Sequence, residues 1–383
     1  MKKKRVIILG STGSVGTQVL KVIQDQRERF EVVALTGKSN LELLQKQAQV
    51  FFPKAVALAD EGKAKRLRKS LKDAQVYTGE EGIVKLVKSF PADLVFSCIS
   101  GKAALMPTLE AIRAGRDVAL ANKEAMVIAG DILMKEARKR KVKLIPVDSE
   151  QSAIFQCLGA HKTSDVRRIY LTASGGPLWN WKGDFNDVLP EEALRHPRWK
   201  MGRKVSLDSA TLVNKALEVI ETSRFFNIEV EKIKVLVHPQ AVVHSMVEFV
   251  DGSILAQLGI TDMRLPIHYA LNYPERRKSH LPFLNLTDLG EIRFEPPDFE
   301  RFPALRLGYQ AGKEGGTFPA VFNAADEVAI EEFLKRRITF PQITQLIEAV
   351  MKEHKNSAEL SLEAILQADE WARRKAYELL EDL

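Results

Sequence analysis

The chain contains 383 residues, of which 45% are hydrophobic and 28% charged, a composition typical of a globular enzyme with two or three domains. Its net charge of +7 would suit an anionic partner, but the basic stretch 63–72 lacks the aromatic side chains that stack on bases, which argues against nucleic acid. The sequence has no apolar run long enough to cross a membrane and no signal-peptide core, so we expect no membrane partner. Cys98 and Cys157 fit neither a disulfide framework nor the spacing of a zinc site, and unpaired cysteines favour a cytoplasmic location.

Short β-branched runs alternate with helical patterns over the first 148 residues. Such alternation predicts a Rossmann-like, doubly wound parallel sheet in an α/β domain spanning 1–148. The runs that we interpret as strands are 5–10, 30–37, 54–59, 93–100, 117–122 and 142–148.

The first run is followed by "GSTGSVG", with glycines at positions 10, 13 and 16. Glycines between a strand and a helix let the backbone turn tightly and approach a pyrophosphate. At the end of the second run, "LTGKSN" has no acidic residue to bind a ribose 2′-hydroxyl, whereas Lys38 and Ser39 could hold a 2′-phosphate. This pattern favours NADPH over NADH, although Lys38 could also be an ordinary loop lysine.

"IPVDSEQSA" places Asp148 and Glu150 directly after a buried strand. If the backbone stays extended, side chains at i and i+2 share a face, and two carboxylates converge there. They are either solvated or bind a divalent cation, and a cation site would require a third ligand from elsewhere.

The pattern is mixed from 149 to 273, where we expect a central α+β domain. "TASGGP" ends a strand in a turn suited to anions, and "SLDSATLVNKALE" predicts a helix that begins near Ser209 or Ala210. On that helix Asn214, Lys215 and Glu218 share a face: Glu218 could complete the metal site and the others could bind phosphate, or Lys215 and Glu218 could form a surface ion pair. Residues 274–299 resemble a linker, and 300–383 predict a C-terminal α-helical domain.

With all these segments considered, the sequence resembles the 1-deoxy-D-xylulose 5-phosphate reductoisomerase family over essentially the whole chain. The motifs that carry the resemblance are "LGSTGSVG", "LANKEA", "PVDSE", "TASGGP", "HPRWKMGRKVSLDSATLVNKALE", "HPQAVVHSMVEFVDGS", "AQLGITDMR" and "FPAVFNAADE". The resemblance implies NADPH- and metal-dependent rearrangement and reduction of 1-deoxy-D-xylulose 5-phosphate to 2-C-methyl-D-erythritol 4-phosphate, in isoprenoid precursor biosynthesis by the non-mevalonate pathway. It also implies one Mg²⁺ or Mn²⁺ per subunit. For 149–273 it implies a catalytic domain with a lid and with strands that help to form a homodimer.

The resemblance also implies roles for individual residues. As metal ligands it implies Asp148, Glu150 and Glu218, and as catalytic residues Lys123, Glu150 and His196. The implied substrate contacts are Lys123, Ser149, Glu150, Ser174, His196, Trp199, Ser209, Asn214, Lys215 and Glu218, with Trp199 in a mobile lid at 196–202. The implied NADPH contacts are Thr12, Gly13, Ser14, Val15, Gly37, Lys38, Ser39, Asn122, Glu124 and Gly202.

The chain departs from the family pattern at Gln151, where many members have histidine, so a proton-transfer role for that histidine cannot apply here. "ISGKAAL" is also less glycine-rich than expected. His238 and His244 could suggest zinc, but a hard divalent ion prefers the carboxylates, and we expect structural or supporting roles for both histidines.

Two other functions remain as alternatives. An NADPH-dependent aldehyde or semialdehyde dehydrogenase would need a reactive cysteine with a nearby base, and neither cysteine has one close in sequence. A non-catalytic NADPH-sensing regulatory protein would have no use for three carboxylate side chains that bind a metal ion.

Overall fold

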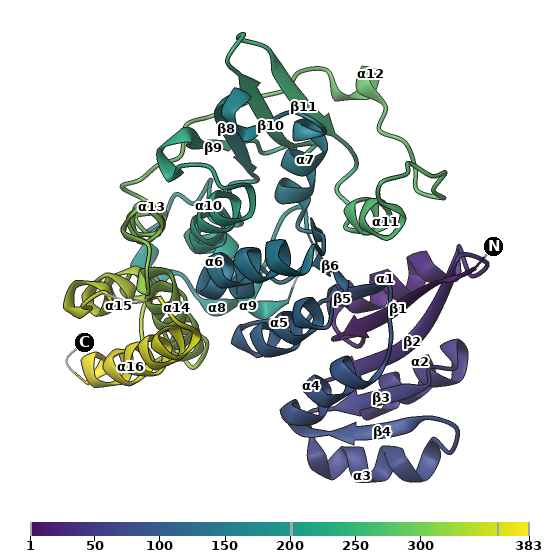
Figure 1. Cartoon of the computed structure of the whole chain (residues 1–383). Helices are drawn as coiled ribbons and strands as arrows, with labels where there is room; N and C mark the ends of the chain where they lie inside the picture. The colour runs from purple at the N-terminus through teal and green to yellow at the C-terminus, as the bar shows by residue number, and fades with distance from the viewer. Residues whose placement is uncertain (1, 200–201, 358–359, 382–383) are drawn as a thin grey trace. The chain divides into compact units, whose positions relative to one another are not determined.

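The computed structural model describes residues 2–199, 202–357 and 360–381 (Figure 1). Contacts between residues divide the chain into two compact units. The first contains residues up to 125, 133–152 and 262–282, and the second contains 126–132, 153–261 and the chain from 283 onward. The sequence suggested four parts instead, and the two descriptions differ most at 262–282, which belongs with the first unit.

The first unit is built on a seven-stranded sheet in the order β4-β3-β2-β1-β5-β6-β7, in which every neighbouring pair is parallel. Its central strands are almost fully buried, which explains their continuous apolar runs. The expected doubly wound α/β fold is therefore confirmed. The strands are β1 (Lys4–Leu9), β2 (Phe30–Gly37), β3 (Ala55–Leu58), β4 (Gln75–Thr78), β5 (Leu94–Ser97), β6 (Asp117–Leu120) and β7 (Leu144–Pro146).

Helices connect these strands, and several begin at a side-chain cap. Asn40, Asp60 and Asn122 each accept a hydrogen bond from a backbone N–H of the first turn that follows. The helix α6 bends at Ala129, where the backbone leaves the helical region. The helices that begin in this unit are α1 (Ser14–Gln24), α2 (Leu41–Phe51), α3 (Glu61–Ser70), α4 (Gly79–Ser89), α5 (Leu105–Arg113), α6 (Lys123–Arg140), α7 (Ser149–Leu158) and α11 (Arg264–Asn272).

The second unit contains a four-stranded mixed sheet in the order β11-β10-β8-β9. Strands β8 and β9 are parallel, whereas β10 runs antiparallel to both β8 and β11. The strands are β8 (Val166–Ala173), β9 (Ile233–Val237), β10 (Val243–Phe249) and β11 (Ile254–Leu258).

The second unit also contains helices, and its C-terminal region is helical as expected (Figure 1). In this region α14 packs against both α15 and α16. Within the described residues, no helix combines the length and apolar character needed to cross a bilayer. The helices are α8 (Pro190–Ala193), α9 (Arg203–Thr211), α10 (Val213–Phe226), α12 (Leu286–Leu289), α13 (Ala304–Glu314), α14 (Phe318–Leu334), α15 (Phe340–Glu353) and α16 (Leu362–Leu380).

Candidate metal, phosphate and cofactor sites

The turn between β1 and α1 depends on its glycines. Gly10 has φ +78°, and a Cβ on Gly16 would lie 2.3 Å from the carbonyl oxygen of Gly10, so neither position accommodates a side chain. Gly13 is the N-cap of α1, whose first turn contains no acidic residue that would repel a phosphate. Thr12, Ser14 and Val15 lie in or beside this turn and are exposed or half-buried.

The end of β2 lies beside the glycine turn. A Cβ on Gly37 would meet the Thr12 hydroxyl oxygen at 3.1 Å, and the backbone N–H of Ser11 donates to the Thr36 carbonyl at 2.7 Å. Lys38 and Ser39 follow as exposed residues. The strand order of the sheet reverses between the neighbouring strands β1 and β5. Doubly wound sheets bind their ligands at the carboxyl ends of the strands, where the order reverses in this way.

The junction of β6 and α6 carries the segment "ANKEA". Asn122 caps α6 by accepting from the N–H of Ala125 at 2.7 Å, and its amide donates to Glu124 at 2.6 Å and to the Gly101 carbonyl at 3.3 Å. Both side chains are buried. They are held at the carboxyl edge of the same sheet, whereas Gly202, another expected cofactor contact, belongs to the second unit as the N-cap of α9.

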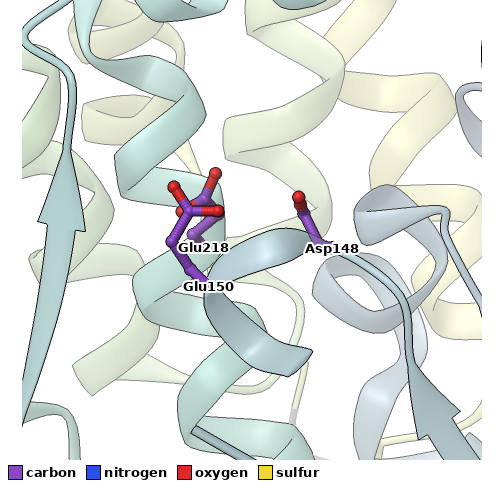
Figure 2. A group of neighbouring side chains, drawn as sticks. All are labelled: Asp148, Glu150 and Glu218. Atoms are coloured by element: carbon purple, nitrogen blue, oxygen red, sulfur yellow. The ribbon is translucent and has the colours of Figure 1, made fainter. Parts of the chain in front are cut away.

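Asp148, Glu150 and Glu218 form a carboxylate group. Each offers one oxygen atom, and these oxygens lie within 4.8 Å of one another (Figure 2). The expected extended geometry is wrong, because β7 ends at Pro146 and Ser149 and Glu150 already begin α7. Asp148 therefore precedes the helix and Glu150 lies in its first turn. Three hard oxygen donors at this spacing fit Mg²⁺ or Mn²⁺.

Ammonium and hydroxyl groups surround these carboxylates. The Lys123 Nζ lies 2.7 Å from Asp148 Oδ2, and both side chains are largely buried, with exposed fractions of 10% and 16%. The Ser149 hydroxyl donates to Glu150, and its backbone N–H donates to Asp148 Oδ1 at 3.0 Å. Cations and donors at these positions offset part of the cost of removing the carboxylates from water.

The predicted helix around Asn214 is two helices. The helices α9 and α10 meet at Leu212, whose φ of +60° breaks the helix, so α10 begins at Val213 and Ser209 lies in α9. In α10 the Asn214 amide and the Lys215 ammonium both donate to Glu218. The pairing of Lys215 with Glu218 is correct but a surface location is wrong, because their side chains are only 4% and 1% exposed.

Ser174 and His196 are hydrogen-bonded partners in the second unit. The His196 Nδ1 accepts from the backbone N–H of Arg198 at 3.2 Å and of Trp199 at 2.9 Å, while Nε2 lies 3.0 Å from the Ser174 hydroxyl. This arrangement places the proton of the neutral ring on Nε2, which donates to Ser174. Burial lowers the pKa of His196 to about 4. The Ser174 hydroxyl also accepts from the N–H of Gly176 at 3.3 Å, so its own hydrogen can be donated to an anion.

Ser209 is packed against the turn that carries Ser174. Gly176 has φ +75°, and a Cβ there would lie 2.2 Å from the Ser209 carbonyl oxygen and 3.3 Å from its hydroxyl. The two serines therefore come from different elements that touch through a glycine. Trp199 is half-buried in the segment 196–202, for which the resemblance implies a lid, and Lys200 and Met201 of this segment lie outside the described residues.

The two histidines that suggested zinc have other contacts. The His238 ring is held by the Arg293 carbonyl at 2.8 Å and by the N–H groups of Val242 and Val243, both at 3.2 Å, so both of its nitrogens are engaged. His244 is buried and also has an interaction partner. The contacts of His238 agree with the structural role expected for it, and the role expected for His244 stays a prediction.

A second charged group comprises the partly exposed Lys204 and the buried Asp208 and Asp326, and sequence patterns did not indicate that these residues meet. The Lys204 ammonium lies within 3.0 Å of a carboxylate oxygen of each aspartate. The only local signal is the four-residue spacing of Lys204 and Asp208, which is common on solvated helices, and nothing in sequence relates either to residue 326.

Comparison with known proteins supports the resemblance over nearly the whole chain. The family model described as 1-deoxy-D-xylulose 5-phosphate reductoisomerase matches 6–130, and two models of C-terminal domains of the same enzyme match 144–226 and 258–375. A reductoisomerase of this name from a Thermoanaerobacter species is 51% identical over 375 residues, which cover 97% of this chain and 98% of the relative. The chain belongs to the 1-deoxy-D-xylulose 5-phosphate reductoisomerase family.

Solved structures of reductoisomerases share the fold. The enzyme from Zymomonas mobilis, in complex with NADPH, has a TM-score of 0.94 and 41% identity, with complete coverage of both chains. A reductoisomerase in complex with NADPH, fosmidomycin and magnesium has a TM-score of 0.93 and 37% identity, and covers 99% of this chain and 98% of that one.

Membership of the reductoisomerase family leaves no support for the dehydrogenase alternative. Burial raises the pKa of the Cys98 thiol, which disfavours the thiolate that such chemistry needs. Cys157 is buried as well.

Proposed function

We propose that Asp148, Glu150 and Glu218 hold the divalent cation with which this reductoisomerase converts 1-deoxy-D-xylulose 5-phosphate to 2-C-methyl-D-erythritol 4-phosphate. The enzyme is an NADPH- and metal-dependent oxidoreductase of isoprenoid precursor biosynthesis. The proposal for its metal ligands is carried by one observation: in a chain of this family, three carboxylate oxygens lie within 4.8 Å of one another.

The donor set suits the chemistry. A divalent cation held by these three carboxylates would polarise the substrate carbonyl and stabilise the negative charge that develops on its oxygens. Lys123, held beside Asp148, adds positive charge near those oxygens, and the Ser149 hydroxyl beside Glu150 can hydrogen-bond to the same part of the substrate.

The phosphate of the substrate is bound by residues of the second unit in this proposal. The groups assigned to it are Ser174, Ser209, Asn214 and Lys215, with His196 orienting Ser174 by donating from Nε2. Hydrogen bonds to a charged group contribute about 1.5–3 kcal/mol each, so this set can retain the phosphate-bearing fragment during the rearrangement.

Trp199 is assigned to a lid that excludes water from the reacting fragments. It follows His196, whose Nδ1 accepts from the Trp199 backbone, so the start of the lid is tied to the phosphate-binding residues. Exclusion of water prevents protonation of the reactive fragment by solvent.

NADPH supplies the hydride when bound, and its proposed site is the carboxyl edge of the seven-stranded sheet. Thr12, Gly13, Ser14 and Val15 lie at the N-terminus of α1, and Gly37, Lys38 and Ser39 follow at the end of β2. Lys38 and Ser39 are assigned to the 2′-phosphate. The remaining assigned contacts are Asn122, Glu124 and Gly202.

We further propose a homodimer in the cytoplasm. The edge strand β11 exposes Ile254 and Leu255, with exposed fractions of 50% and 44%, and an exposed apolar edge favours pairing with another strand. The two cysteines are free, which suits a reducing compartment.

Oxidation of NADPH in the presence of 1-deoxy-D-xylulose 5-phosphate tests the proposal. We expect turnover that a chelator abolishes and that added Mg²⁺ or Mn²⁺ restores. Substrate-dependent turnover that survives complete removal of metal would contradict it, and so would NADPH binding without any turnover, which would support the sensor alternative.

A further inference from the structure

Helix α14 of the C-terminal region places the carboxylate of Asp326 beside Lys204 of α9. The Lys204 Nζ lies 2.7 Å from Asp208 Oδ2, one turn along α9, and 2.9 Å from Asp326 Oδ2, near the middle of α14. All three residues belong to the second unit. The side chains of Asp208 and Asp326 are 2% and 0% exposed, whereas that of Lys204 is 22% exposed, so both carboxylates of the contact are buried.

Helix stability does not explain a lysine at this position. The N-terminal end of a helix carries partial positive charge, and α9 begins with Arg203 and Lys204 and has no acidic residue in its first turn. A buried carboxylate, in contrast, requires a cationic partner. The ion pairs therefore fix the register between α9 and α14, because moving α9 would separate Lys204 from Asp326 and leave a buried charge.

The part of α9 that these ion pairs hold in place is next to Ser209, one of the residues assigned to the substrate phosphate. Ser209 directly follows Asp208, and its carbonyl oxygen lies so close to Gly176 that a Cβ there would approach it to 2.2 Å. Gly176 in turn donates its N–H to the Ser174 hydroxyl. A shift of α9 would thus change the positions of Ser209 and of the turn that carries Ser174.

We propose that Lys204 is a positioning residue for phosphate binding. By bridging Asp208 and Asp326, it uses the C-terminal helix α14 to hold Ser209 and the Ser174 turn at the separation that one phosphate group requires. This inference rests on the proposed function, in which these two serines bind the substrate phosphate.

The test replaces Lys204 with methionine, which keeps most of the side-chain length and removes the charge. Because the phosphate takes no part in bond breaking, Lys204→Met should raise KM for the sugar phosphate about tenfold while kcat changes less than about threefold. KM for NADPH should stay within about twofold. The rise in Tm that inorganic phosphate produces should shrink, since it reports phosphate binding without turnover. Lys204→Arg should restore most of both effects.

Arg373→Met is the matched control. Arg373, on α16, pairs with Asp369 on its own helix and with Glu327 of α14, the residue after Asp326. Its loss removes a comparable ion pair from the same helix without touching α9. We expect a lower Tm in this variant, with unchanged KM for the sugar phosphate and an unchanged response to phosphate.

A Lys204→Met protein with a lower Tm but the KM and phosphate response of the wild type would overturn the inference, and so would equal effects of the Arg373 control. If Lys204→Met does not fold, Asp326→Asn replaces it, because this change keeps the Lys204–Asp208 pair. Asp326→Asn should also raise KM for the sugar phosphate, and an unchanged KM would overturn the inference. A wild-type enzyme that neither turns over the sugar phosphate nor responds to phosphate would instead contradict the proposed function.

Discussion

Glu218 is the residue in which the proposed metal and phosphate sites meet. Asn214 and Lys215 both donate to it from its own helix, and its carboxylate belongs to the group with Asp148 and Glu150. Glu218→Gln keeps the shape and can still accept hydrogen bonds, but it removes the charge that a hard cation requires. We expect the concentration of Mg²⁺ or Mn²⁺ that gives half-maximal turnover to rise at least about 100-fold, as measured by metal titration of the chelator-treated enzyme.

Glu221→Gln provides the control for this prediction. Glu221 is equally buried, one turn further along α10, and it is outside the carboxylate group. Its replacement should leave the metal requirement within about threefold of the wild type, whatever it does to stability. If the two variants showed the same metal requirement, Glu218 would not be a ligand.

His196 gives a prediction about pH. Its pKa falls from the usual 6.5 to about 4 because burial disfavours the charged ring, so between these values the unfolded chain binds a proton that the folded chain does not. This histidine therefore contributes stability above pH 6.5 that is lost as the pH falls towards 4. An NMR titration of the imidazole signals in the free enzyme should show a His196 pKa well below 6.5, and His196→Gln should make Tm less dependent on pH in this range. A measured pKa at or above 6.5 would contradict the buried, neutral ring.

At the scale of elements, Gly16 in the β1–α1 turn and Gly62 in α3 differ in the space available for a side chain. A Cβ on Gly16 would lie 2.3 Å from Gly10 O, whereas on Gly62, in α3, the nearest atom would be Asp60 Oδ1 at 3.5 Å. Gly16→Ala should distort the turn and raise KM for NADPH at least about tenfold. Gly62→Ala should instead stabilise the protein by about 0.4–1 kcal/mol, because alanine is the better helix former. Steady-state kinetics and thermal unfolding measure the two effects, and an unchanged KM in Gly16→Ala would remove this turn from the cofactor site.

Element types were predictable from sequence where a pattern is long and local. The eight-residue run 30–37 is β2 in full, because buried parallel strands are apolar throughout. Strand β4 escaped detection because its sequence, "QVYT", is short and polar at an exposed edge. The break at Leu212 was also missed, since leucine favours helices and only the tertiary packing of its buried side chain explains a positive φ.

At the scale of the whole molecule, long-range proximity was the part that sequence could not supply. The prediction that Asp148, Glu150 and Glu218 meet needed the family resemblance as well as the motifs, because periodicity relates only residues of one element. Lys204 and Asp326, 122 residues apart, lie in two motifs of the family resemblance, but nothing in either motif indicates that they are in contact.

Assembly is also a property of the whole molecule. In the proposed dimer the apolar side chains of β11 are covered, so Leu255→Lys should give a monomer, or a weaker dimer, in sedimentation experiments. Phe52→Lys is the control: Phe52 is also exposed, at 80%, but it follows α2 in the first unit, and we expect the wild-type mass. If Leu255→Lys sedimented like the wild type, β11 would not be the dimer contact.

The location of a bound cation tests the metal site most directly. Crystals grown with Mn²⁺ should show one anomalous difference peak per chain, bonded to oxygens of Asp148, Glu150 and Glu218, and the peak should be absent in Glu218→Gln crystals prepared in the same way. A peak bound elsewhere in the chain, or the three carboxylates turned away from one another with no ion among them, would contradict the account.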